Sequence, residues 1–170
     1  MLFRSDASVE LKRFETATGS VTTRRVAMGD FFTGFRTTVR GNDELLTAVM
    51  VPRLTSGREG VFVKLGLRAA QAISVVHLGL VLERDGDGVV ADARVALGSV
   101  APTVVLVPEV TDVLVGRPLS DEVIEAAASA GAAAIEPIND VRGTARYRRS
   151  TTRVVIGRAL QAVRAGQARA

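Results

Sequence analysis

The 170-residue chain contains no cysteine and only one histidine, His77. Without cysteine it can form no disulfide, and it can offer no thiolate to an iron–sulfur cluster or a zinc ion. A single histidine allows neither a two-histidine metal site nor a histidine relay. We therefore predict no metal site within this chain, and we also expect it to hold no catalytic residue.

Aromatic residues and lysine are also scarce. Aromatics make up 4% of the chain and tryptophan is absent, so the core must consist mainly of Val, Leu, Ile and Ala. Lys12 and Lys64 are the only lysines. No apolar run approaches the roughly 20 residues that a membrane-spanning helix needs, and the N-terminal residues lack a signal-peptide apolar segment. These absences lead us to expect a soluble, cytoplasmic protein.

The residues that are present indicate a globular protein with a basic end. Hydrophobic residues account for 47% and charged residues for 24%, and the net charge is +4. From Val141 onward the chain has eight arginines and no acid. Nucleic-acid binding is one interpretation of such a tail. Only Tyr147 could stack on bases there, so we favour a solvated or interface helix face and expect no nucleic-acid partner.

The first third of the chain has the pattern of strands. Val9 and Leu11 alternate with polar residues, residues 18–20 (TGS) suit a turn, and residues 21–26 can return as a second hairpin arm. Residues 44–51 (ELLTAVMV) predict another strand. The polar, glycine-containing residues 54–60 (LTSGREG) are the best candidate for a domain linker.

The remainder predicts an α+β unit. Residues 73–84 and 89–100 are strands joined by the DGDG turn at 85–88, which we interpret as a hairpin and not as a cation site. Residues 104–107 can add an edge strand. Helices follow over 108–115, from the N-cap Ser120 to about Ile135, and from about 143 to 160. We expect an antiparallel meander packed on about three helices.

Five segments in one order resemble the FAD-binding medium subunit of molybdenum hydroxylases of the carbon monoxide dehydrogenase and xanthine dehydrogenase type. They are residues 29–34 (GDFFTG), 42–46 (NDELL), 62–74 (FVKLGLRAAQAIS), 96–103 (ALGSVAPT) and 140–148 (DVRGTARYR). Each segment alone is weak evidence, but the ordered set covers nearly the whole chain.

The resemblance concerns only the C-terminal half of that subunit. It implies an antiparallel three-stranded meander on a helix bundle over residues 59–165. A partial α/β FAD-binding subdomain would precede it over residues 1–53. The family cradles the FAD pyrophosphate in two glycine-rich loops further upstream, and this sequence has no such loop. A split gene with a separate chain carrying the N-terminal FAD lobe, a truncated product and a fragment are the three explanations.

The resemblance also implies cofactor contacts. Leu45 matches a position that lies against the isoalloxazine ring of FAD. Lys64, with Val63 before it, matches a second position, where a cation would stabilise negative charge on the ring. The structural alternatives are an ordinary strand residue for Leu45 and a surface lysine for Lys64.

Two functions follow as expectations. In the first, the chain belongs to a flavoprotein component that passes electrons from iron–sulfur clusters through FAD to an external acceptor. Its partners would be a molybdopterin-binding large subunit and a [2Fe–2S] small subunit, which alone carry those cofactors. In the second, the chain is a truncated, flavin-free structural or subunit-docking domain.

Overall fold

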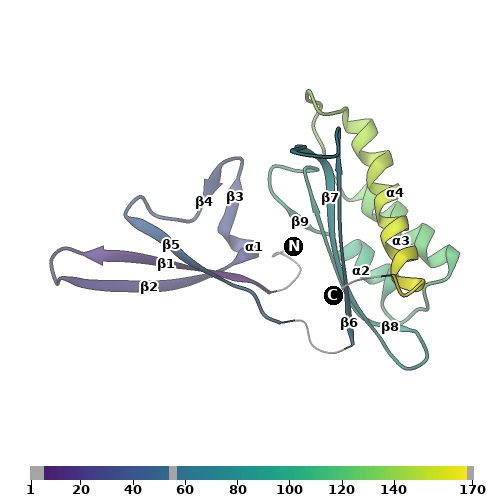
Figure 1. Ribbon diagram of the computed structural model, residues 1–170, viewed down its shortest axis with the longest axis horizontal. Coiled ribbons are helices and arrows are strands. Elements are labelled where there is room, and N and C mark those ends of the chain that lie inside the picture. The colour runs from purple at the N-terminus through teal and green to yellow at the C-terminus, as the bar shows by residue number, and fades with distance from the viewer. Residues whose placement is uncertain (1–5, 54–56, 168–170) are drawn as a thin grey trace. The chain divides into compact units, whose positions relative to one another are not determined.

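The computed structural model describes residues 6–53 and 57–167. Residues 6–53 form one compact unit and residues 57–167 form another, and each unit has its own hydrophobic core (Figure 1). Residues 54–56, the first three of the predicted linker, lie outside the described residues.

The first unit is a small antiparallel sheet with one helical turn. Its elements are β1 (Ser8–Glu15), β2 (Ser20–Ala27), α1 (Met28–Phe31), β3 (Phe32–Gly34), β4 (Thr37–Thr38) and β5 (Glu44–Met50), with sheet order β2-β1-β5 and a separate β3-β4 pair. The predicted alternation in β1 is confirmed, because Val9 and Leu11 are buried. They pack with Met28 and Phe31 into a core of few residues.

The second unit contains a four-stranded antiparallel sheet. Its strands are β6 (Arg58–Gly66), β7 (Ser74–Arg84), β8 (Val90–Gly98) and β9 (Val105–Leu106), paired in sequence order. The expected antiparallel meander is present, but the expected number of three strands is wrong. The strand that was not expected is β6. The edge strand expected over residues 104–107 is present as β9, which pairs with Ala96 and Leu97 before Pro108 begins a helix.

Strand β6 begins inside the segment that the sequence marked as a linker. Arg58 donates to Glu83 and to Asp92, at 3.1 Å in each case. Glu59 accepts from Arg84 Nε at 2.9 Å. These cross-strand ion pairs explain how a polar stretch is held in a sheet, since opposite charges on neighbouring strands attract.

Three helices cover one face of this sheet: α2 (Pro108–Leu114), α3 (Asp121–Ala133) and α4 (Ala145–Arg164). The predicted N-cap is confirmed, because Ser120 Oγ accepts a hydrogen bond from Val123 N at 3.3 Å. Thr144 caps α4 in the same way through Tyr147 N, at 3.1 Å. No helix in the described ranges is both long and apolar enough to span a bilayer.

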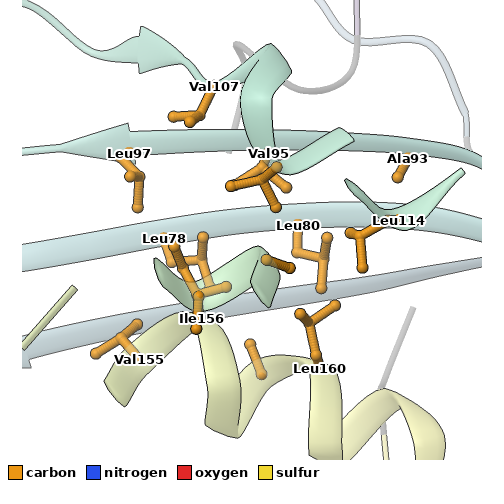
Figure 2. Close-up of a cluster of buried hydrophobic side chains, with 14 of the residues drawn as sticks. Leu78, Leu80, Ala93, Val95, Leu97, Val107, Leu114, Val155, Ile156 and Leu160 are labelled. Atoms are coloured by element: carbon orange, nitrogen blue, oxygen red, sulfur yellow. The ribbon is translucent and has the colours of Figure 1, made fainter. Parts of the chain in front are cut away.

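The core of the second unit lies between the sheet and the helices. Leu78 and Leu80 of β7 and Val95 and Leu97 of β8 point towards α4, which contributes apolar residues on one stripe (Figure 2). Those α4 residues are Val155, Ile156, Ala159, Leu160 and Val163. The chain therefore combines antiparallel sheets with four helices among its described residues.

Candidate functional site

Strand β6 places its side chains alternately on the two faces of the sheet. Val61, Val63 and Leu65 are partly buried and pack against the core under the helices. Phe62 and Lys64 are exposed on the other face, which we call the outer face. The predicted site residues Val63 and Lys64 therefore have side chains on opposite sides of the sheet, and only Lys64 presents its side chain on the outer face.

The cross-strand register aligns the outer-face residues in rows. One row consists of Lys64, His77 and Gly98, and the next consists of Phe62, Gly79, Ala96 and Leu106. Directly opposite residues on neighbouring strands have adjacent side chains on one face. Lys64 is thus part of a four-strand surface formed by residues distant in sequence.

The second row has large side chains at its ends and almost none between them. Phe62 is 50% exposed and Leu106 is 52% exposed, whereas Gly79 and Ala96 between them are buried. Three inter-strand spacings separate the two large residues, or roughly 14 Å. A flat, apolar group could lie along this row, because the glycine and the alanine add almost no side chain between the two large residues.

His77, in the neighbouring row with Lys64 and Gly98, lies against the backbone of the sheet. A Cβ at position 98 would overlap the imidazole ring, so the ring occupies the space above Gly98. The Phe62 and His77 ring centroids are 6.2 Å apart, with the planes tilted by 48°. Burial of the ring, aided by nearby positive charge that includes Lys64, lowers the pKa of His77. We therefore expect the imidazole to be neutral at pH 7.

Lys64 supplies the positive charge next to this neutral ring. Its ammonium group forms no ion pair with any residue in the described part of the chain. An exposed cation beside an apolar row can interact with an anionic edge of a bound ligand. The arrangement suits a planar ligand that carries negative charge at one edge.

Leu45 lies in the first unit, near the start of β5. It is 72% exposed and pairs across the sheet with Lys12. The preceding residue, Glu44, accepts from Arg24 Nε at 2.6 Å and from Gly41 N at 2.6 Å. These hydrogen bonds, that from Arg24 above all, lower the pKa of Glu44 to about 2. A carboxylate that is charged at neutral pH thus holds the strand end that carries Leu45.

The three predicted site residues do not form one cluster within either unit. Val63 and Lys64 are in the second unit, and Leu45 is in the first. Phe62, Gly98 and Leu106, which border Lys64 or the adjoining row, were not predicted from the sequence. The strand alternation of residues 61–65 could have indicated that Phe62 lies on the same face as Lys64. Gly98 and Leu106 depend on strand register, which no local pattern reveals.

Other parts of the described chain offer no better candidate for a ligand site. A hollow of about 810 Å³ lies between α3 and α4, away from Lys64, and it is lined by Ile124, Ala128, Val154, Gly157 and flanking charged residues. It is open to solvent and contains two acids and two arginines, so nothing in it selects a ligand. Within residues 6–53 and 57–167, no group of three or more His, Asp or Glu side chains could hold a metal ion.

Comparison with known proteins identifies the family. Residues 62–163 match the model of the CO dehydrogenase flavoprotein C-terminal domain. The nicotine 6-hydroxylase medium subunit of Paenarthrobacter nicotinovorans is 33% identical over 138 residues, which are 81% of this chain and 47% of that protein. The carbon monoxide dehydrogenase medium chain of Hydrogenophaga pseudoflava is 30% identical over 82% of this chain and 48% of its own length.

Solved structures agree with this result. A structure of carbon monoxide dehydrogenase from Hydrogenophaga pseudoflava matches with a TM-score of 0.84 and 28% identity, over 99% of this chain and 55% of that chain. The chain spans about half the length of these relatives. The matched range runs from Phe62 in β6 to Val163 in α4, and on this evidence the chain belongs to the CO dehydrogenase flavoprotein C-terminal domain family.

Proposed function

We propose that the chain is the C-terminal part of the flavoprotein component of a molybdenum hydroxylase complex. Residues 1–53 would be the end of the FAD-binding subdomain, and residues 59–165 the C-terminal domain. The observation that carries the proposal is the outer face, where Lys64 adjoins the row of Phe62, Gly79, Ala96 and Leu106. That row suits the flat, largely apolar isoalloxazine ring of FAD.

Each candidate residue has a distinct role in this proposal. Lys64 would stabilise negative charge on the flavin by Coulomb attraction. Val63, whose side chain is in the core, could face the cofactor only through its backbone. Leu45 would provide an apolar contact from the first unit. FAD, when bound, supplies the electron-transfer chemistry, and the phosphate-binding loops would come from upstream residues absent from this sequence.

The rest of the complex follows from this proposal. Electrons would pass from [2Fe–2S] clusters on a small subunit through FAD to an external acceptor. A large subunit would hold the molybdopterin cofactor, oxidise the substrate and determine its identity. A separate chain carrying the N-terminal FAD lobe would complete the flavin site if the gene is split. The complex would act in the cytoplasm.

Absorbance spectroscopy tests the flavin assignment. The chain should be purified alone and after co-expression with an upstream half taken from a medium subunit of the same family. Bands at about 375 and 450 nm, typical of oxidised flavin, are expected in the co-expressed sample. Lys64→Gln should then lower the flavin reduction potential, and Lys12→Gln, the other lysine, should leave it unchanged. A flavin-free co-purified pair would reject the assignment of Leu45 and Lys64.

A flavin-free docking domain is the second candidate function. It is favoured by the absence of any glycine-rich phosphate loop in the sequence and by the strongly exposed apolar residues Phe14, Leu45 and Val49 of the first unit. Such residues need a covering partner even where no cofactor binds. A stable complex with the upstream half and no flavin absorbance would support this function.

A further inference from the structure

Three loops meet at one end of the second unit. Strand β6 ends at Gly66, β7 begins at Ser74 and β8 ends at Gly98, all at the same end of the sheet. The first turns of α4 lie there too, because Arg148 donates to the backbone oxygen of Ser99 (Figure 1). Gly143, in the loop before α4, packs close to Val75 of β7 and Tyr147 of α4, because a Cβ at position 143 would lie within 3.8 Å of both.

Five large apolar side chains are exposed on these loops and on the first turn of α4. The exposed fractions run from 48% for Tyr147 to 99% for Val141, with Leu67, Ile73 and Ile138 in between. We call these five residues the loop end. Solvent-exposed apolar groups concentrated at one end of a domain mark a surface that another molecule covers.

The segments that carry the loop end are basic. Residues 67–73 and 138–149 contain five arginines and one acid, Asp140. That acid is already paired, because it accepts from Arg142 and from Arg148. Arg146 is exposed and has no ion pair within the described ranges. A partner that matches this charge must bring acidic residues to the rim of an apolar contact.

A buried arginine holds the loop end in place. The side chain of Arg148 is 2% exposed and links Ser99 of the β8–β9 loop to Asp140 of the α3–α4 loop. Asp140 also accepts from Arg142 N at 2.8 Å, and Asn139 Oδ1 accepts from Ala145 N at 2.7 Å. A surface ordered before binding pays less conformational entropy when a partner docks.

We infer that the loop end docks a partner protein whose contact face is apolar at its centre and acidic at its rim. The partner would lie beside Lys64, which is two residues from the end of β6. The further identification of this partner as the [2Fe–2S] subunit rests on the proposed function. Nucleic acid fits less well, since four of the five loop-end residues are aliphatic and cannot stack on bases.

Co-expression of the chain and its upstream half with a candidate [2Fe–2S] subunit and a molybdopterin subunit tests the inference. Complex formation would be measured by sedimentation, and flavin content by absorbance. Val141→Asp and Arg146→Glu should each weaken binding of the [2Fe–2S] subunit about tenfold or more and leave the flavin bands intact. Val115→Asp, near the start of β8 at the opposite end, and Arg158→Glu, elsewhere on α4, are matched controls that should bind normally.

The outcomes separate this inference from the proposed function. A flavin-loaded wild-type complex that tolerates Val141→Asp and Arg146→Glu overturns the docking surface alone. So does a flavin-loaded chain that binds neither subunit. A complex that contains no flavin but is still weakened by Val141→Asp overturns only the flavin assignment. Self-association abolished by Val141→Asp, or salt-sensitive duplex DNA binding abolished by Arg146→Glu, would assign the loop end to a different occupant and overturn the inference.

Discussion

At the scale of single residues, Gly98 is a position of the outer face with no room for a larger side chain. The imidazole ring of His77 occupies the space that a Cβ at position 98 would need. We expect Gly98→Ala to displace the ring and to lower the free energy of unfolding by about 1–3 kcal/mol, as overpacking does.

Nuclear magnetic resonance can follow this displacement directly. His77 is the only histidine, so imidazole signals from labelled histidine report on this ring alone. Gly86→Ala is the control, because a Cβ there meets no atom within 4 Å. Unchanged imidazole signals in Gly98→Ala would contradict the packing of His77 on Gly98.

Glu44 makes the stability of the first unit depend on pH. Its pKa is lowered from 4.5 to about 2, first by the hydrogen bond from Arg24 and then by that from Gly41 N. A carboxylate with a depressed pKa in the folded state stabilises that state above its ordinary pKa, and the contribution is lost as the pH falls through the folded value. The stabilisation should therefore disappear between pH 4.5 and about 2.

Glu44→Gln should remove this pH dependence. Circular dichroism of denaturant unfolding at several pH values would show a smaller loss of stability on acidification in the variant than in the wild type. Asp30→Asn, an exposed acid of the same unit, should keep the wild-type pH profile. If the stability of the wild type and of Glu44→Gln changed with pH in the same way, Glu44 would not be the group responsible.

At the scale of the elements, α3 and α4 depend on a glycine between them. A Cβ on Gly131 would overlap Ile156 Cδ1 and lie 3.0 Å from Val110 Cγ2. We expect Gly131→Ala to destabilise the second unit by about 1–3 kcal/mol. Ile156→Val removes the overlapping methyl, so the double variant should regain part of the stability lost in Gly131→Ala. A double-mutant cycle of unfolding free energies would measure the coupling between the two positions.

A second helical glycine provides the contrast. A Cβ on Gly157 of α4 would meet no neighbouring atom within 4 Å. Gly157→Ala should therefore stabilise the chain by up to about 1 kcal/mol through helix propensity. If both glycine variants changed stability in the same direction, close packing at Gly131 would not be the cause.

The elements predicted correctly from sequence are those with a local signal. Ser120 as an N-cap, the period-2 alternation of β1, and the turn at Asp85, whose carboxylate accepts from Asp87 N and Val89 N, all involve neighbours in sequence. Strand β6 was not predicted, and its first residues, Arg58 and Glu59, are polar and were assigned to the linker. Their strand conformation depends on ion pairs with residues about 25 positions away.

The candidate site shows the same division between local and distant information. Lys64 stood out from the sequence through its rarity and through the family resemblance. Its position beside His77 and Gly98 depends on the pairing of three strands. Leu45 was named from the resemblance alone, and the pairing of Glu44 with Arg24, which fixes the start of its strand, spans 20 positions in sequence.

At the scale of the whole molecule, the two units have cores of very different size. The core of the first unit consists of Ala7, Val9, Leu11, Met28 and Phe31, with Val26 and Val39 packed beside it. The core of the second unit joins a four-stranded sheet to three helices. Because hydrophobic stabilisation grows with buried apolar area, the first unit should unfold at a lower temperature than the second.

Leu11→Ala tests this difference and connects it to the proposed upstream half. It should lower the stability of the first unit by about 2–5 kcal/mol and leave the second unit unchanged, whereas Gly131→Ala should have the reverse effect. Hydrogen exchange measured by mass spectrometry resolves the two units in one sample. Binding of an upstream half should raise protection in β1 and β5, since a ligand of the folded state stabilises it. Equal loss of protection in both units for either variant would mean that they unfold as one cooperative structure.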